Sequence, residues 1–226
     1  MKTFVSLTSL ALMEALALAQ TTIGFGPYFS LGPTKSWIRE ANTTLVLPTV
    51  PNPAVDRLAL WPGMGTSDGD LIQAIAVATA NPATECRGTT GQWCVFASTL
   101  ESQQEAGTQS PQNAGAHLII HYVYNDSTQK YDQAVSINGK VLSTLSTSSG
   151  NAQGWGTAVE CQESACHGTV ATHQYLDTTI VLNAADPTFG NTLALNEVSS
   201  SGLSTTDGGK TWVVKTIKVQ QHTFNL

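Results

Sequence analysis

The sequence has few charged side chains and, after its first 19 residues, no long apolar run. Only 12% of the 226 residues are charged, and 10 Lys and Arg against 16 Asp and Glu give a formal net charge of -6. So few basic residues do not form the positive surface that binds nucleic acid. No later segment approaches the roughly 20 apolar residues that span a bilayer. We therefore expect neither nucleic acid nor a membrane as a partner.

Motifs that bind metals or nucleotides are missing as well. The sequence contains no H-E-x-x-H, Walker or G-x-G-x-x-G pattern. His117 and His121 would lie about 13 Å apart on a strand, too far to share a metal ion. The sequence therefore predicts no metal and no cofactor. Asp68 and Asp70, on either side of a glycine, leave a calcium loop open beside the simpler interpretation as a polar turn.

The beginning of the chain has the pattern of a secretory signal peptide. An apolar run over Phe4–Ala19 ends in Ala17-Leu18-Ala19, a small-x-small cleavage pattern. We expect residues 1–19 to be removed and residues 20–226 to form one secreted, extracellular domain, present as a monomer. About 200 residues suit a single all-β domain.

The chain has only four cysteines, an even number that in a secreted protein predicts disulfides. Three connectivities are open, and the close spacings favour the local pairs Cys86–Cys94 and Cys161–Cys166. Two N-glycosylation sequons begin at Asn42 and Asn125, and we expect both to lie on the surface.

Hydrophobic residues recur with a period of two, and no long helical period follows the signal peptide. Short segments rich in β-formers alternate with turns rich in Gly, Pro, Asn and Ser, which predicts an antiparallel β-sandwich or jelly roll. Asn138-Gly139 predicts a type I′ hairpin. Thr205–Trp212 resembles the Asp-box turn, to which we assign a structural role. The expected strands are Thr44–Leu47, Arg57–Trp61, Asp70–Ala78, Trp93–Ser98, His117–Tyr124, Tyr131–Ile137, Lys140–Leu145, Thr157–Gln162, Thr178–Asn183 and Lys210–Gln220.

Two polar residues stand out within the predicted strands. Gln73 is the one polar residue of the apolar run Leu71–Val77, where an unpaired buried amide would cost about 1–3 kcal/mol. Glu160 lies near the end of a strand, close to Trp155, and an apolar setting suits a carboxyl group for acid or base catalysis. A solvent-facing strand end is the alternative for Glu160.

Three stretches resemble the eqolisins, the fungal glutamic peptidases. Trp61-Pro62-Gly63-Met64-Gly65 followed by Leu71-Ile72-Gln73 is similar to one motif of that family. Ala114–Leu118 and the hairpin Tyr131–Leu145 resemble its following strands, and Glu160 falls near the place of its glutamate. The resemblance implies a concanavalin A-like β-sandwich. It also implies a secreted fungal acid endopeptidase in which Glu160 activates a water while Gln73 orients it and stabilises the oxyanion.

The sequence leaves open whether the chain is an enzyme, because such sandwiches also bind or cleave glycans. In that alternative, Trp61, Trp93 and Trp155 are the expected stacking platforms for sugar rings. The expected partner is accordingly an extracellular polypeptide or polysaccharide.

Overall fold

The structure is a computed structural model that describes residues 22–52, 57–163 and 167–225. Secondary structure in these residues is almost entirely β. Within them, no helix is both long and apolar enough to cross a membrane. The elements are β1 Thr22–Leu31, β2 Ile38–Val46, β3 Arg57–Thr66, β4 Leu71–Ala78, α1 Pro82–Cys86, β5 Trp93–Leu100, β6 Gln104–Ala106, β7 Ser110–Gln112, β8 His117–Asn125, β9 Lys130–Ile137, β10 Lys140–Thr147, β11 Ala152–Glu163, β12 His167–Val170, β13 His173–Leu182, the 3₁₀ turn η1 Phe189–Thr192, β14 Ala194–Asn196, β15 Val198–Ser200, β16 Leu203–Ser204, β17 Thr211–Val219 and β18 His222–Asn225.

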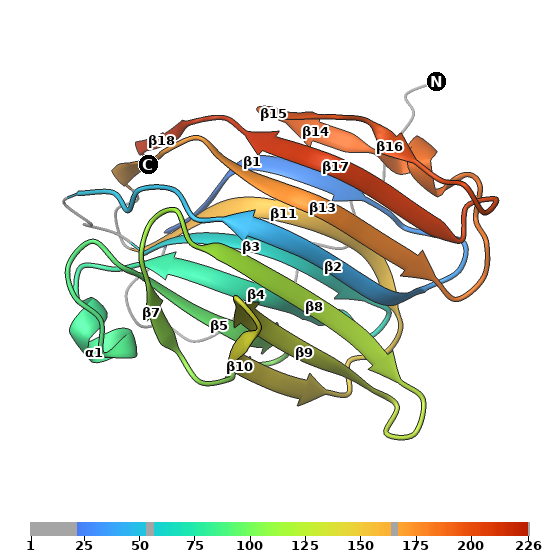
Figure 1. Cartoon of the computed structure of the whole chain (residues 1–226), viewed down its shortest axis with the longest axis horizontal. Helices are drawn as coiled ribbons and strands as arrows, with labels where there is room; N and C mark the ends of the chain where they lie inside the picture. The colour runs from blue at the N-terminus through green and yellow to red at the C-terminus, as the bar shows by residue number, and fades with distance from the viewer. Residues whose placement is uncertain (1–21, 53–56, 164–166, 226) are drawn as a thin grey trace.

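Apart from β12 and β18, which pair with each other, the strands form two antiparallel layers packed face to face (Figure 1). The first layer has the order β14-β1-β11-β3-β4-β5, with β6 and β7 paired to β5. The second has the order β17-β13-β2-β8-β9-β10, with β15 and β16 paired to β17. One pair, Ala152 with Ile38, continues the hydrogen bonding from β11 into β2. The predicted antiparallel β-sandwich is confirmed.

Strand alternation sends one set of side chains between the layers and the other set away from them. In β4, Ile72, Ala74 and Ala76 belong to the main core. In β11, Trp155 and Val159 do the same. The residues between them point to the opposite side of the first layer, which we name the outward face.

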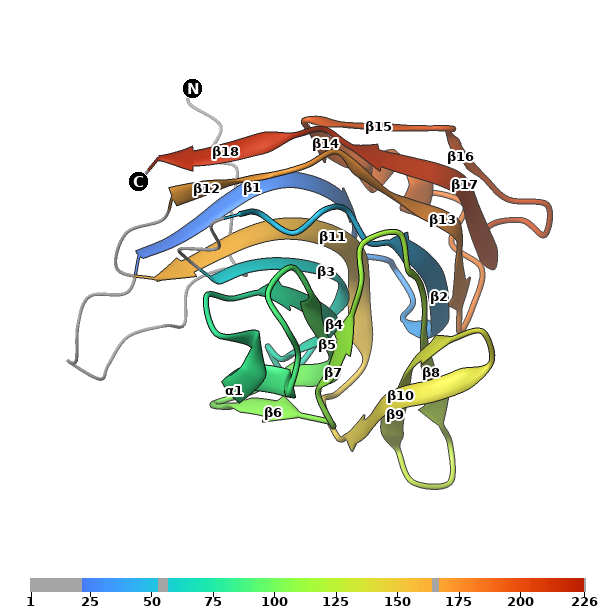
Figure 2. The same ribbon diagram turned by 60° about the vertical axis from the view of Figure 1, so that its left-hand side comes forward.

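The outward face is concave. In Figure 2, β1, β11 and β3 are arcs whose convex side faces β13 and β17 of the second layer. The core lies on that convex side, because buried residues of both layers, such as Phe29 and Tyr175, belong to one cluster. The short helix α1 lies on the concave side in the same view.

The predicted strands are present, but several are longer than expected. Trp61-Pro62-Gly63 lies inside β3, which continues to Thr66, so the expected end of this strand at Trp61 was wrong. The pairing of β3 with β4 runs from Leu60 directly to Gly63, so the proline, which has no N–H, falls in a gap of the ladder. The Pro62 carbonyl accepts a hydrogen bond of 2.7 Å from Tyr122 Oη.

Both turn predictions agree with the structure. Asn138 and Gly139 have φ values of 50° and 78°, as a type I′ hairpin requires. In the Asp-box, Asp207 Oδ1 accepts hydrogen bonds from the amides of Lys210 at 3.1 Å and Thr211 at 2.8 Å. Trp212 is 7% exposed and donates to the Gly209 carbonyl. This loop is a structural turn.

A buried carboxylate, Asp186, joins the Asp-box to the loop after β1. Its Oδ2 accepts from Thr34 Oγ1 at 3.0 Å and the Lys35 amide at 2.8 Å, and its Oδ1 from the hydroxyl and amide of Thr188. Its own amide donates to Gly209. Burial alone would raise the pKa of Asp186, but the hydrogen bonds from Thr188, Lys35 and Thr34 hold it at about 2.

We predict that Asp186→Asn destabilises the fold by roughly 2 kcal/mol at neutral pH, the free energy that corresponds to lowering the pKa from 3.8 to about 2. Because the folded pKa is depressed, this stabilisation is present above about pH 4 and is lost as the pH falls toward 2. Urea unfolding of both proteins between pH 2 and 7 measures it. The difference between them should shrink on acidification.

Asp177→Asn is the matched control, because the side-chain contact of Asp177 within the described residues is an exposed ion pair with Lys215 at 3.1 Å. We expect its effect to stay below about 1 kcal/mol. Equal losses for the two variants would show that the Asp186 network does not stabilise the fold beyond an ordinary surface charge.

Candidate active site

Gln73 lies on the outward face of β4, with Leu71, Ile75 and Val77. It is 4% exposed. The strand register places it opposite Ser98 of β5 and Gly63 of β3. No hydrogen bond of its side chain is found within the part of the chain that the structure describes. The polar residue that stood out in the sequence therefore does face away from the core.

Glu160 lies on the outward face of β11, where it is opposite Ala59 of β3 and Phe25 of β1. Its neighbours in the strand, Val159 and Cys161, belong to the core, which fixes the direction of the carboxyl group. Glu160 is 8% exposed.

Two neutral donors bind the Glu160 carboxylate. Trp61 Nε1 donates to Oε2 at 2.8 Å, and Gln162 Nε2 donates to Oε1 at 2.6 Å. Gln162 shares the outward face because it lies two positions further along the same strand. Trp61 comes from β3, so the carboxylate is held from two strands.

Gln73 and Glu160 share a face but are not in contact. Gln73 is paired with Gly63 of β3, and Gly63 is paired with Gly156 of β11. Gly156 lies four residues before Glu160 in the same strand. Four residues along a strand and two strands across give a Cα separation of about 16 Å. Trp61 lies between them. The amide in contact with Glu160 is that of Gln162, which the sequence analysis did not single out.

Small residues form the floor between Gln73 and Glu160. The outward positions there include Gly63, Gly156, Ala59 and Ala158. A Cβ at Gly63 would lie 2.8 Å from the Ile72 carbonyl oxygen, and one at Gly156 would lie 2.7 Å from that of Phe29. No larger residue fits at these glycines. Trp61 is consequently the one large side chain of this part of the floor among the described residues.

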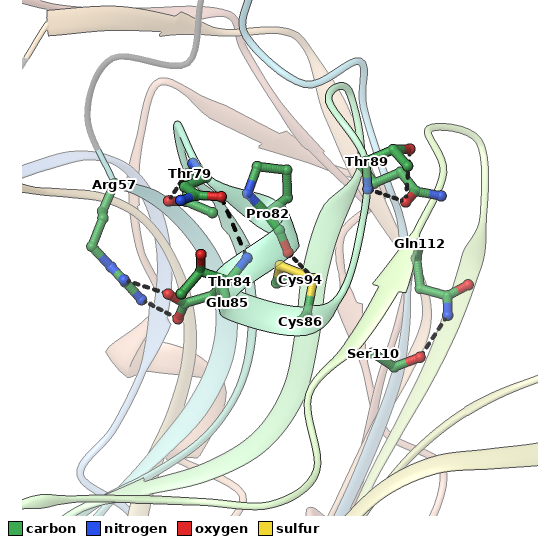
Figure 3. The surroundings of a disulfide bond; sticks show 12 residues. Arg57, Thr79, Pro82, Thr84, Glu85, Cys86, Thr89, Cys94, Ser110 and Gln112 are labelled. Atoms are coloured by element: carbon green, nitrogen blue, oxygen red, sulfur yellow. Dashed lines mark hydrogen bonds and ion pairs between the residues drawn. A yellow bond between two sulfur atoms is a disulfide. The ribbon is translucent and has the colours of Figure 1, made fainter.

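The helix α1 is fixed to the outward face by the Cys86–Cys94 disulfide (Figure 3). Cys94 faces outward and packs with Cys86, Val77 and Phe96 in a second apolar cluster. The predicted disulfide between these cysteines is confirmed. Cys161 is also disulfide-bonded, while Cys166, its predicted partner, lies outside the described residues.

An ion pair ties α1 to β3. Arg57 donates to both carboxylate oxygens of Glu85, at 3.0 and 2.8 Å, as Figure 3 shows. The hydrogen bond from Arg57 lowers the pKa of Glu85 against the opposing effect of burial. Arg57 pairs with Gln162 across the ladder, so the helix is anchored beside the end of the sheet that carries Glu160.

Two of the three predicted sugar platforms are core residues. Trp93 is 0% exposed and donates to the Pro48 carbonyl at 2.8 Å. Trp155 is 1% exposed and packs edge-on against Phe29. Neither indole presents a face to a ligand, so these two assignments were wrong. Of the three, Trp61 alone lies on the outward face, and there its N–H binds Glu160.

The remaining sequence features have local roles. Asp70 belongs to a turn in which its amide donates to Thr66 Oγ1 at 3.2 Å, and burial, followed by the charge of Asp68, raises the pKa of Asp70.

Gly65–Gly69 has the G-x-S-x-G spacing of some hydrolases, which the sequence analysis passed over. It forms a hairpin turn between β3 and β4, where Ser67 Oγ binds Asp68 and the Asn151 amide. No cluster of three metal-ligating residues occurs within the described ranges.

The two sequons differ in their surroundings. Asn42 is half-buried on β2, in register with His121 of β8. Asn125 caps its own turn, because its Oδ1 accepts from the Ser127 amide and its Nδ2 donates to Asp132 at 3.0 Å.

A hollow of about 530 Å³ lies on the outer face of the second layer, between β8, β9 and β10. Its charged groups are already paired. His121 binds Glu40 at 2.8 Å, and Asp132 accepts from Asn125 and Ser146. Glu160 on the first layer differs from these groups, because it is a nearly buried carboxylate whose described partners are two neutral donors.

Three solved peptidase structures share this fold. They are scytalido-glutamic peptidase with a peptide-based transition-state analogue (TM-score 0.53, 10% identity), the same peptidase with a transition-state analogue inhibitor (0.55, 11%), and SCP-B, a member of the eqolisin family, with the tripeptide Ala-Ile-His (0.51, 11%). Each match covers 87% of this chain and 99% of the peptidase. The resemblance expected from the sequence is thus confirmed for the fold. No protein-family model and no curated protein sequence matches the chain.

The contact between Trp61 and Glu160 can be tested by a double-mutant cycle. We predict that Trp61→Phe and Glu160→Ala, measured singly and together by urea unfolding, show a coupling of about 1.5–3 kcal/mol, the range of a hydrogen bond to a charged group. Trp212→Phe is the matched control, because the Trp212 indole donates to Gly209 instead. Additive effects of the Trp61 and Glu160 changes would contradict the contact.

Proposed function

We propose that this chain is a secreted acid endopeptidase that uses Glu160 as its general base. The observation that carries the proposal is the Glu160 carboxylate, which is nearly buried on the concave face and held by Trp61 and Gln162. The fold shared with peptidases solved with transition-state analogues supports it. A disulfide is typical of proteins exposed to an oxidising environment, which supports secretion.

The small-residue floor suits an extended polypeptide as the substrate. With few side chains above Gly63, Gly156, Ala59 and Ala158, a substrate backbone approaches the sheet closely. Two antiparallel strands flanking the floor, β4 and β1, supply its walls. A single chain with one such face is sufficient for the reaction, in keeping with a monomer.

The proposed reaction needs no group beyond the chain and a water. Glu160 takes a proton from the water, whose oxygen attacks the peptide carbonyl carbon and forms a tetrahedral intermediate. The intermediate collapses when the C–N bond breaks, and the protonated Glu160 gives its proton to the leaving amine. The Gln162 amide, already within hydrogen-bond distance of Glu160, is the donor placed to bind the oxyanion.

We predict that the purified protein hydrolyses casein at pH 3–4 and that Glu160→Gln abolishes this hydrolysis, because a neutral amide cannot take the proton. Appearance of peptides measured by mass spectrometry gives the rate. Glu101→Gln, at an exposed position after β5, is the matched control and should retain full activity. Hydrolysis that survives in Glu160→Gln would remove this residue from the mechanism.

The two outward glutamines should differ in their effect on catalysis. We predict that Gln162→Met lowers kcat by about 10²–10³-fold, as loss of an oxyanion donor does, while Gln73→Met leaves kcat nearly unchanged. The substitution is the same and both residues lie on the outward face, so each variant controls for the other. If Gln73→Met lowers kcat and Gln162→Met does not, the amide that binds the oxyanion would be that of Gln73, as the sequence resemblance implies.

A further inference from the structure

An apolar stripe on β1 lies beside Glu160. Ile23, Phe25 and Tyr28 are 37%, 52% and 40% exposed, and they account for half of the large apolar residues that are exposed in the described part of the chain. Exposed apolar side chains that gather in one place mark a binding surface. We name these three residues the β1 stripe.

The strand register places the whole stripe on the outward face. Phe25 is directly opposite Glu160, and Ile23 is opposite Gln162. Tyr28 is opposite Ala158. Leu195 of β14 is also exposed, but it pairs with the core residue Phe29 and so belongs to the other face.

An irregularity in β1 keeps the stripe together. Residues three apart on a regular strand point to opposite faces, yet Phe25 and Tyr28 share one face because the register shifts between them. Such bulges re-aim side chains, often next to active sites. The bulge contains Gly26, where a Cβ would lie 2.8 Å from His222 Cδ2, so a larger residue there would displace the His222 ring.

We propose that the β1 stripe is a specificity subsite that takes a large apolar side chain of the polypeptide, next to the bond that Glu160 attacks. Directly opposed residues of an antiparallel pair have their Cβ atoms about 5 Å apart. A substrate side chain that contacts Phe25 therefore belongs to a substrate residue within about one position of the peptide bond that lies over Glu160. The position of the cleaved bond rests on the proposed function, whereas the apolar subsite does not.

The carboxylate within the patch favours a polypeptide over a second copy of this chain as the occupant. A dry contact between two copies would remove the remaining water from Glu160, which is 8% exposed and whose described partners are neutral. Fully burying a carboxylate without a cationic partner is unfavourable. A substrate brings water and peptide N–H groups to the same place. It therefore covers the apolar side chains without leaving the charge unsolvated.

The test uses two hexapeptides of Gly and Ala that differ only in a central Leu or Ser. We expect the full-length protein to cleave the Leu peptide with a kcat/KM at least tenfold above that for the Ser peptide, as apolar pockets discriminate. Phe25→Ser should remove most of this preference. Val141→Ser is the matched control, because Val141 is 56% exposed on β10 of the second layer. The Val141→Ser variant should prefer the Leu peptide over the Ser peptide as strongly as the unchanged protein does.

Binding to the Glu160→Gln protein, measured by calorimetry, separates the subsite from the catalysis. Leu-selective binding that is lost in the Phe25→Ser, Glu160→Gln double variant, without cleavage by the unchanged protein, would uphold the subsite and overturn the peptidase proposal. Equal binding and cleavage of the two peptides, or no binding of either, would overturn the subsite. A fall in sedimentation coefficient with Phe25→Ser would also overturn it, because the stripe would then be an interface between copies.

Discussion

The register of β3 between β4 and β11 is the constraint on which the outward face depends. A strand alternates its side chains with a period of two, so a shift by one residue would turn Glu160 into the core and Val159 out of it. Val159 and Cys161 pack in the core and prevent this shift. The same register brings the Trp61 indole to Glu160 and places glycines where a Cβ would clash with a carbonyl oxygen of the neighbouring strand.

The site combines a rigid floor with parts added from outside the sheet. Small residues of β3 and β11 leave the floor open, and α1 is fixed beside it by a disulfide and by the pair of Arg57 with Glu85. On the opposite side, the bulge of β1 turns Phe25 and Tyr28 toward the floor. Polar and apolar groups from several strands thus surround Glu160. The fold itself is shared with proteins of about 10% identity.

Features that depend on neighbours in sequence were predicted well, and those that depend on distant partners were not. Asn138-Gly139 formed its hairpin because φ at both residues is a local property. β1 was missed because its glycines and a proline hide the alternation, and because a bulge interrupts it. Trp93 and Trp155 were assigned to the surface because the period of a strand does not say which of its faces is covered.

The sequence by itself determined the antiparallel β-class, the local turns, the Cys86–Cys94 disulfide and the two polar residues, Gln73 and Glu160, that stand out in apolar strands. Only the tertiary structure decided which side chains meet Glu160. Trp61 lies 99 residues away in the chain, and its contact exists because two strands pair in one register. Pairing between distant strands is set by the packing of the whole core, which no local pattern of residues encodes.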